Sequence, residues 1–221
     1  MIKAIIFDLD GTLVDSLNDL KDSINQALLK NNYQRQYNYQ ETKMLIGSGI
    51  RVLCSRALSY IDHQVEDEEK LYADFQKFYK INQLNHTAAY PNVEETLLAL
   101  KKLGIKLAIL SNKREENTKI IVKKIFQDGL FDIVIGQREN VPLKPDPTSL
   151  NLLIKELDID LEQILYVGDS DTDMKTALNA KVKKVAVTYG YRSKEILEIY
   201  QPEYMIDSFN QILDIVTKNN L

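Results

Sequence analysis

Short runs of apolar residues recur along the chain, and most of them end in a cluster of polar or acidic residues. The runs are rich in β-branched residues and lack the strict alternation of apolar and polar positions that marks a half-exposed strand. Such runs are typical of strands buried on both faces of a parallel sheet. The predicted strands are Lys3–Phe7, Lys106–Leu110, Phe131–Ile135, Ile164–Val167 and Lys184–Val187.

Segments with helical spacing of leucine and isoleucine lie between these strands. Gly104 directly follows the first of them and is well suited to end a helix. Alternation of strands and helices predicts an α/β fold with an open, doubly wound, mainly parallel sheet and a Rossmann-like core. The predicted helices of this core are Val93–Leu103, Thr148–Leu157 and Asp171–Ala180.

One long segment breaks the alternation, because from about Leu17 to Asn85 the pattern indicates helices only. We therefore predict an inserted all-helical cap domain at residues 16–87 within an α/β core made of residues 1–15 and 88–221. Hinges are expected near Leu13–Ser16 and Asn85–Pro91. The helices predicted for the insert are Leu17–Lys30, Glu41–Leu45, Gly49–Tyr60 and Asp67–Leu84.

Composition narrows the classes of function. The chain has 28 Lys and Arg against 32 Asp and Glu, a formal charge of −4, which argues against nucleic acid as a partner. No stretch approaches the about 18 apolar residues of a membrane span, and the apolar N-terminal run is too short for a signal peptide. We expect a soluble cytoplasmic protein that does not bind membranes. Cys54 has no second cysteine to pair with and is interpreted as a small buried apolar residue.

The strongest chemical signal is the string Asp8-Leu9-Asp10-Gly11-Thr12 directly after the first predicted strand. Two carboxylates this close repel each other unless a positive charge lies between them, and hard oxygen ligands favour Mg²⁺. A second acidic cluster, with Asp169 and Asp173, follows the strand at Ile164–Val167. Its two carboxylates can supply the remaining ligands, although Asp173 can also act as a helix-capping residue.

Two further elements carry groups that can hold a phosphate. Lys144 stands in the sequence Lys144-Pro145-Asp146-Pro147, whose prolines restrict the backbone around one cation. That cation can neutralise a carboxylate and a phosphate together. Ser111 and Asn112 end the strand at Lys106–Leu110 and offer a hydroxyl and an amide as hydrogen-bond donors to phosphate oxygens.

These four elements, in this order, resemble the haloacid dehalogenase superfamily, and specifically its phosphatases with a helical cap inserted after the first motif. The resemblance implies that Asp8 is the nucleophile and forms an aspartyl-phosphate. It implies that Asp10 is the general acid that protonates the leaving oxygen and then the base that activates water. Ser111 and Lys144 would hold the transferred phosphoryl group, with Asn112, Gly11 and Thr12 also in the phosphate-binding set.

The same resemblance implies the metal ligands. Mg²⁺ would be bound by the Asp8 carboxylate, the Asp10 backbone carbonyl and Asp169, with Asp173 in support. One departure from the family pattern is Lys181, which stands after Ala180 where the family often has glycine. We expect this change to affect only the end of a helix.

Within the superfamily the chain most resembles phosphoglycolate phosphatases, chiefly in the stretch Gly47-Ser48-Gly49 and the helix that follows it. The resemblance implies a small phosphorylated metabolite as substrate, 2-phosphoglycolate first, with Gly47, Gly49 and Arg51 contacting its leaving group. An ordinary helix–helix turn would also explain the two glycines.

Other functions stay open. A pyrophosphatase or a nucleotidase would share every core motif, and so would a sugar-phosphate mutase. Mutases of this superfamily usually have a cap histidine shortly after the first motif, and none occurs in Leu17–Asp22. A non-catalytic binding protein would be expected to lack an acidic motif residue, and all are present here. His63 and His86 lie outside every motif. The chain is expected to be a monomer or a homodimer.

Overall fold

The computed structural model describes residues 1–220, and the chain divides into two compact units. The α/β unit consists of Met1–Val14 together with Ala89–Leu221, and the helical unit consists of Asp15–Ala88. Each unit is described here by itself. The chain passes between the units at two short strands, β2 (Val14–Asp15) and β3 (Ala88–Ala89), which pair as a two-stranded sheet.

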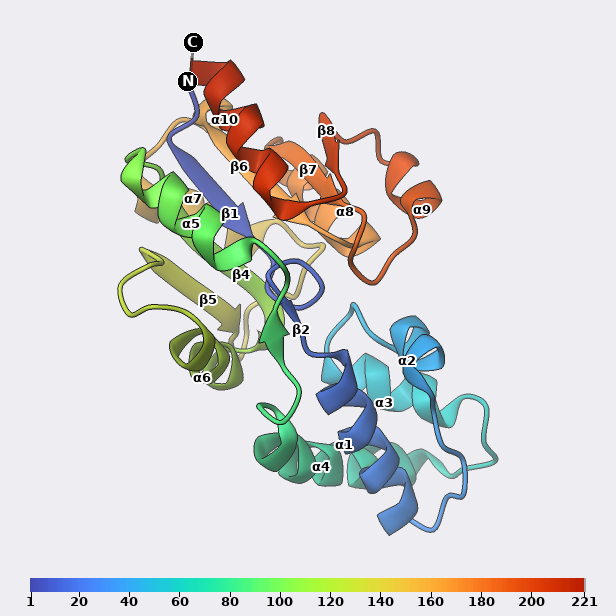
Figure 1. Cartoon of the computed structure of the whole chain (residues 1–221). Helices are drawn as coiled ribbons and strands as arrows, with labels where there is room; N and C mark the ends of the chain where they lie inside the picture. Colours follow the sequence, from blue (N-terminus) through green and yellow to red (C-terminus); the bar gives the residue numbers. More distant parts are fainter. Residues whose placement is uncertain (221) are drawn as a thin grey trace. The chain divides into compact units, whose positions relative to one another are not determined.

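The α/β unit is built on a six-stranded sheet with the order β5-β4-β1-β6-β7-β8, in which every pairing is parallel (Figure 1). The central strand β1 lies between β4 and β6, so that Ala4 is opposite both Lys106 and Ile164. This topology confirms the predicted α/β fold with a parallel sheet. The strands are β1 (Ala4–Phe7), β4 (Lys106–Arg114), β5 (Ile133–Gln137), β6 (Ile164–Gly168), β7 (Lys183–Val187) and β8 (Tyr204–Ile206).

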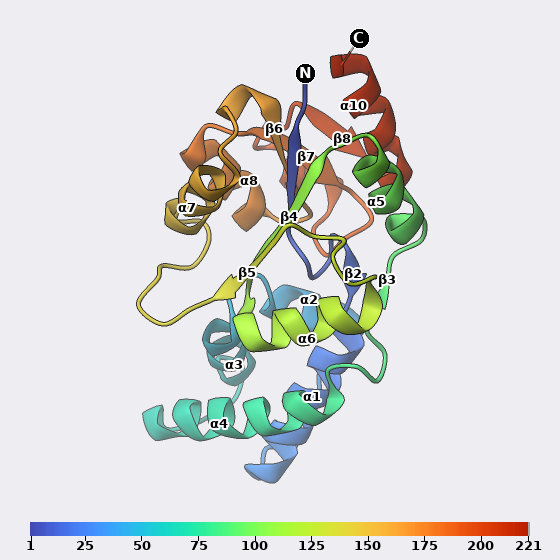
Figure 2. The same ribbon diagram turned by 90° about the vertical axis from the view of Figure 1, so that its left-hand side faces the viewer.

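Helices cover both faces of this sheet (Figure 2). Ile5 and Phe7 of β1 pack in one hydrophobic cluster with residues of α5 and α10, whereas Ala4 and Ile6 pack in another with residues of α7 and α8. All four side chains of β1 are buried, which explains why the strand shows no polar alternation. The helices are α5 (Val93–Lys102), α6 (Glu115–Ile125), α7 (Thr148–Leu157), α8 (Asp171–Ala180), α9 (Lys194–Glu198) and α10 (Ile212–Asn220), with 3₁₀ turns at Leu161–Gln163 and Phe209–Gln211.

The helical unit contains α1 (Leu17–Lys30), α2 (Tyr39–Leu45), α3 (Ile50–Leu58) and α4 (Val65–Asn82), and no strand occurs between residues 17 and 85. Polar contacts join α1 to α4, including one from Lys30 to Asp74 at 2.8 Å. Within residues 1–220, no helix is both long and apolar enough to cross a membrane.

A buried carboxylate joins the first and last segments of the helical unit. Asp19, in the first turn of α1, accepts hydrogen bonds from the backbone N–H groups of His86 and Thr87 and from the Thr87 hydroxyl, at 2.6–3.2 Å. Its side chain is fully buried, so these donors replace water around the charge. The acid therefore ties the beginning of α1 to the segment that leaves α4.

Candidate active site

The first motif leaves the sheet at the carboxyl end of its central strand. The Asp8 N–H donates to the Val167 carbonyl at 2.9 Å, so the nucleophile candidate still belongs to the ladder between β1 and β6. Gly11 then adopts a φ of 88°, in the left-handed region. A Cβ at this position would overlap the Asp169 carboxylate, so only glycine lets the loop come this close to that acid.

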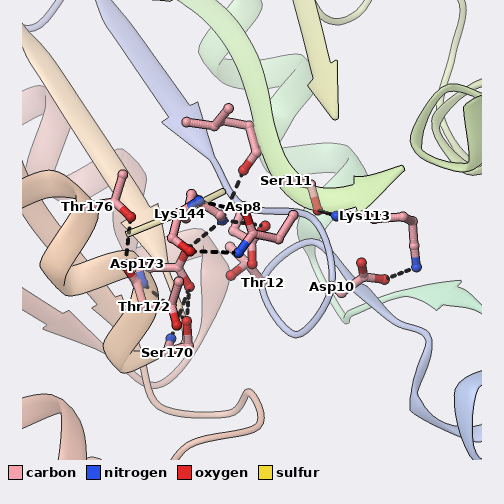
Figure 3. A network of polar contacts seen from close by, with 12 residues as sticks. Asp8, Asp10, Thr12, Ser111, Lys113, Lys144, Ser170, Thr172, Asp173 and Thr176 are labelled. Atoms are coloured by element: carbon pink, nitrogen blue, oxygen red, sulfur yellow. Dashed lines mark hydrogen bonds and ion pairs between the residues drawn. The ribbon is translucent and has the colours of Figure 1, made fainter. Parts of the chain in front are cut away.

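Lys144 is the buried cation of the site. Its Nζ lies 2.9 Å from Asp8 Oδ1 and 2.7 Å from Asp173 Oδ1, and the side chain is 3% exposed. It also donates to the Leu110 carbonyl and to the Tyr166 hydroxyl, both at 3.1 Å. The predicted cation and the predicted nucleophile are thus in direct contact (Figure 3).

Asn112 holds the backbone of Lys144. Its Oδ1 accepts from the Lys144 N–H at 2.8 Å, and its Nδ2 donates to the Lys144 carbonyl at 3.0 Å. This amide, predicted to lie near the phosphate, therefore fixes the position of the cation. Ser111 is buried beside it, and its hydroxyl accepts from the Lys113 N–H at 3.2 Å.

Asp173 combines two structural tasks at the start of α8. Its Oδ2 accepts from the N–H and hydroxyl of Ser170, at 3.1 and 2.5 Å, in a capping box that begins the helix. Its Oδ1 accepts from Lys144 and from the Tyr166 hydroxyl. A Cβ at Gly168 would overlap the Asp173 side chain, so this glycine makes room for the carboxylate.

Asp169 follows β6 and is held from two sides. Its Oδ1 accepts from the Thr12 hydroxyl at 3.2 Å, and its Oδ2 accepts from the Tyr191 N–H at 2.8 Å. Thr12, predicted for phosphate binding, therefore uses its hydroxyl to orient this acid. Asp169 is 1% exposed, so its position is well defined by the surrounding protein.

Asp8, Asp169 and Asp173 form a buried acidic cluster in which one oxygen from each lies within 4.8 Å of the others. Burial raises the pKa of Asp8 to about 7; the charge of Asp173 adds to this, and Lys144 opposes it. Burial, followed by the charges of Asp173 and Asp8, also raises the pKa of Asp169 well above its ordinary range.

Lys144 balances only part of this negative charge. Burial works against its ammonium, but Asp173 and Asp8 hold its pKa well above the ordinary value. Asp8 Oδ1 faces the Lys144 ammonium at 2.9 Å, and its remaining lone pair is available to a further partner. Three hard carboxylates, of which two contact one ammonium, therefore fit an additional divalent cation.

Asp10 lies apart from this cluster. Figure 3 shows its carboxylate turned toward Lys113, whose Nζ is 2.7 Å from Asp10 Oδ1. Lys113 was not among the predicted site residues. The sequence does contain an indication of its role. Lys113 stands two positions after Ser111, β4 extends to Arg114, and alternate residues of a strand share a face, so Lys113 and Ser111 are expected on the same side of the sheet.

The remaining candidates, Gly47, Gly49 and Arg51, belong to the helical unit. Gly47 and Gly49 have φ values of 115° and 86° in the turn between α2 and α3, so this turn requires them. The Arg51 guanidinium is exposed, lies 2.6 Å from Glu69 and stacks on Tyr72 at 4.1 Å.

Comparisons with known proteins agree with this geometry. Residues 5–187 match the haloacid dehalogenase-like hydrolase family. A phosphoglycolate phosphatase of Haemophilus influenzae (strain Rd) is 36% identical, with 97% of this chain and 98% of that protein covered. One from Colwellia psychrerythraea is 34% identical over 96% of this chain and 95% of its own length.

A solved structure of a predicted phosphoglycolate phosphatase from Haemophilus somnus is similar along the whole chain. It has a TM-score of 0.90 and 35% identity, with 97% of this chain and 98% of that chain covered. The protein therefore belongs to the haloacid dehalogenase-like hydrolase family.

Proposed function

We propose that this protein is a Mg²⁺-dependent phosphatase that hydrolyses a small phosphate monoester, 2-phosphoglycolate first, through an aspartyl-phosphate on Asp8. The observation that carries the proposal is the contact between Asp8 and Lys144 inside a buried acidic cluster. The Asp8 carboxylate can attack phosphorus, and the adjacent ammonium can neutralise the charge of the phosphoryl oxygens.

In the first step an Asp8 oxygen attacks phosphorus in line with the leaving group. The new bond joins Asp8 to phosphorus, the bond from phosphorus to the ester oxygen breaks, and Asp10 gives its proton to that oxygen. Lys144 and the Ser111 hydroxyl hold the phosphoryl group, and Asn112 keeps Lys144 in place. Positioning and charge neutralisation supply most of the catalysis in phosphoryl transfer.

In the second step Asp10 accepts a proton from a water molecule that attacks the phosphorus of the acyl phosphate. The bond from phosphorus to Asp8 breaks, and inorganic phosphate and the free carboxylate are restored. Asp10 has then gained the proton that it lost in the first step, so one water is consumed for each ester hydrolysed. The same carboxyl group serves as acid and then as base.

The Asp8 carboxylate, the Asp10 backbone carbonyl and Asp169, with Asp173 in support, are the groups that we propose to hold Mg²⁺. When bound, the ion would supply positive charge to offset the acidic cluster and the phosphate. The donor set supports this choice, because it consists of hard oxygen atoms and contains no sulfur or imidazole.

The relatives support the substrate class. The similar proteins from Haemophilus influenzae and Colwellia psychrerythraea are phosphoglycolate phosphatases and align over nearly the whole chain. The core motifs act on the phosphoryl group, which every phosphate ester shares, so selection of the leaving group requires other residues. We propose that residues of the helical unit, Gly47, Gly49 and Arg51 among them, provide it.

The test is a panel of 2-phosphoglycolate, sugar phosphates, nucleotides and pyrophosphate, assayed with Mg²⁺ and with chelator. Phosphoglycolate should be among the best substrates, and chelation should abolish its turnover. The Asp8→Asn variant keeps the shape of the side chain but removes the attacking charge, so kcat should fall on the order of a thousand-fold or more. Asp171→Asn, in the same acidic motif but outside the proposed site, should leave kcat nearly unchanged.

Two results would count against the proposal. Substantial activity in pure Asp8→Asn protein would exclude the aspartyl-phosphate. Rapid turnover of pyrophosphate or a nucleotide without any turnover of phosphoglycolate would exclude the named substrate and leave the phosphatase chemistry in place.

A further inference from the structure

A second buried lysine accompanies the other acid of the first motif. Lys113 Nζ lies 2.7 Å from Asp10 Oδ1, with side-chain exposures of 5% and 17% respectively. Lysine is seldom buried unless it is paired, because removing an ammonium from water is costly. The two acids of Asp8-Leu9-Asp10 therefore each contact a different buried ammonium, Lys144 for Asp8 and Lys113 for Asp10.

The backbone of Lys113 is fixed on both sides. Its N–H donates to the Ser111 hydroxyl, and its carbonyl accepts from the Thr118 hydroxyl, both at 3.2 Å. A Cβ at Gly136 would lie 2.6 Å from the Lys113 carbonyl oxygen, so β5 approaches this carbonyl too closely for any side chain at that position. Lys113 thus presents its ammonium from a rigid part of the sheet.

We propose that Lys113 is a positioning residue that fixes the Asp10 carboxyl for proton transfer to the leaving group. The inference rests on the proposed function, in which Asp10 carries that proton. Proton transfer requires the acid to lie within hydrogen-bond reach of its partner. In the structure the contact with Lys113 holds the Asp10 carboxylate in one orientation, separate from the carboxylates of Asp8, Asp169 and Asp173 (Figure 3).

The dependence on the leaving group tests this role. An alkoxide such as glycolate leaves with difficulty unless it is protonated, whereas p-nitrophenolate is stable as an anion. A defect in the proton donor should therefore lower kcat/KM for 2-phosphoglycolate far more than for p-nitrophenyl phosphate. A general loss of site structure would lower both values by the same factor.

The experiment compares Lys113→Met, Lys113→Arg and Asp10→Asn on these two substrates with saturating Mg²⁺. We expect Lys113→Met to lower kcat/KM on the order of 100-fold for phosphoglycolate and less than about tenfold for the aryl ester. Lys113→Arg should recover part of the loss. Lys184→Met is the matched control, because Lys184 is a similarly buried lysine paired with Glu203 outside the site, and it should keep the wild-type ratio of the two substrates.

A double-mutant cycle supplies the second readout. If Lys113 acts through Asp10, Lys113→Met should cause little further loss in the Asp10→Asn background. Equal losses on both substrates, or losses that multiply in the double variant, would overturn the proposal. Wild-type protein that hydrolyses no phosphate ester would instead reject the proposed function, and this is measured before any variant is compared.

Discussion

At the scale of single residues, the Lys144 ammonium is shared among several oxygen atoms, one of which belongs to Asp8. Four oxygen atoms lie within 3.1 Å of its Nζ, but an ammonium has only three protons to donate. The Leu110 carbonyl, the Tyr166 hydroxyl and Asp173 accept them. Asp8 Oδ1, at 2.9 Å from the same ammonium, competes with these three acceptors for its protons.

Substrate choice also belongs to this scale. Replacing Arg51 with Ala should raise KM for 2-phosphoglycolate much more than KM for p-nitrophenyl phosphate, because only the former carries a carboxylate for the guanidinium to bind. A charge-assisted contact contributes about 1.5–3 kcal/mol, or roughly ten- to a hundred-fold in kcat/KM. The Arg51–Glu69 pair is exposed, and exposed pairs contribute little, so its loss should not obscure the effect.

Arg35→Ala is the control for that measurement. Arg35 belongs to the same unit, pairs with Glu41 at 2.7 Å and lies over the ring of Tyr37, so it matches Arg51 in its protein contacts. Steady-state kinetics give KM and kcat of both variants on both substrates, and only Arg51→Ala should show the selective rise in KM for 2-phosphoglycolate. Equal changes for Arg51→Ala and Arg35→Ala would show that Arg51 has only a structural role.

At the scale of elements, α8 ends with a left-handed residue that is lysine and not glycine. The helix ends at Ala180, and Lys181 adopts φ 59° and ψ 34° in the left-handed region. Its N–H donates to the Leu178 carbonyl, and the Val182 N–H donates to that of Ala177, so the closing turn is complete. A Cβ in this conformation costs roughly 1–2 kcal/mol, which glycine does not incur.

Replacing Lys181 with Gly should therefore stabilise the protein by about 0.5–1 kcal/mol, after allowance for the greater freedom of glycine in the unfolded chain. The lysine side chain is exposed, so little packing is lost. Lys155→Gly, at an exposed position within α7, should destabilise by about 1 kcal/mol. Urea unfolding of the two variants measures both effects, and a destabilised Lys181→Gly variant would contradict the argument.

The elements that sequence patterns predicted are those with the clearest apolar runs. All five predicted strands are present, because each carries a continuous apolar run. The strands β1 and β6 are buried throughout, whereas the edge strand β5 is only partly buried. The edge strand β8 was missed, since Tyr204–Ile206 is too short to show a period. Helix α6 was missed as well, because Glu115–Ile125 follows directly on the polar end of β4 and is rich in charged residues.

The sequence predicted where in the fold the candidate site residues lie, but it did not predict which of their atoms make contact. A parallel sheet brings the carboxyl ends of β1, β4 and β6 together, so motif residues after these strands had to be neighbours. Which atoms meet depends on rotamers and loop shape, which a sequence pattern does not contain. The use of Asn112 to hold Lys144, and of Lys113 to hold Asp10, emerged only from the structure.

At the scale of the whole molecule, the acidic cluster makes stability depend on pH. The folded pKa of Asp8 is about 7, against an ordinary value of 3.8, so between these values the folded state binds more protons than the unfolded chain. Stability falls with rising pH wherever the folded state binds more protons. The contribution of Asp8 is therefore fully present below about pH 4 and is lost as pH rises through 7 in metal-free protein.

The proposed Mg²⁺ should offset this loss, so its stabilising effect should be larger at pH 8 than at pH 5. A ligand at about 100 times its Kd stabilises by about 2.7 kcal/mol, which corresponds to about 5–10 °C in Tm for a chain of this size. Calorimetry with Mg²⁺ and with chelator at both pH values measures the difference. Asp169→Asn should reduce the shift, and an equal shift at pH 5 and pH 8 would contradict the linkage to Asp8.

The position of β1 at the centre of the sheet has a consequence for biosynthesis. Ala4 pairs with Lys106 and Ile164, so β1 leaves the ribosome before either of its sheet partners has been made. The helices of residues 17–82 form a compact unit of their own and can fold during that interval, whereas the non-local parallel pairing of β1 is slow. The apolar strand Ala4–Phe7 thus remains unpaired while the helical unit and α5 are made, when nascent chains are exposed to aggregation and to capture by chaperones.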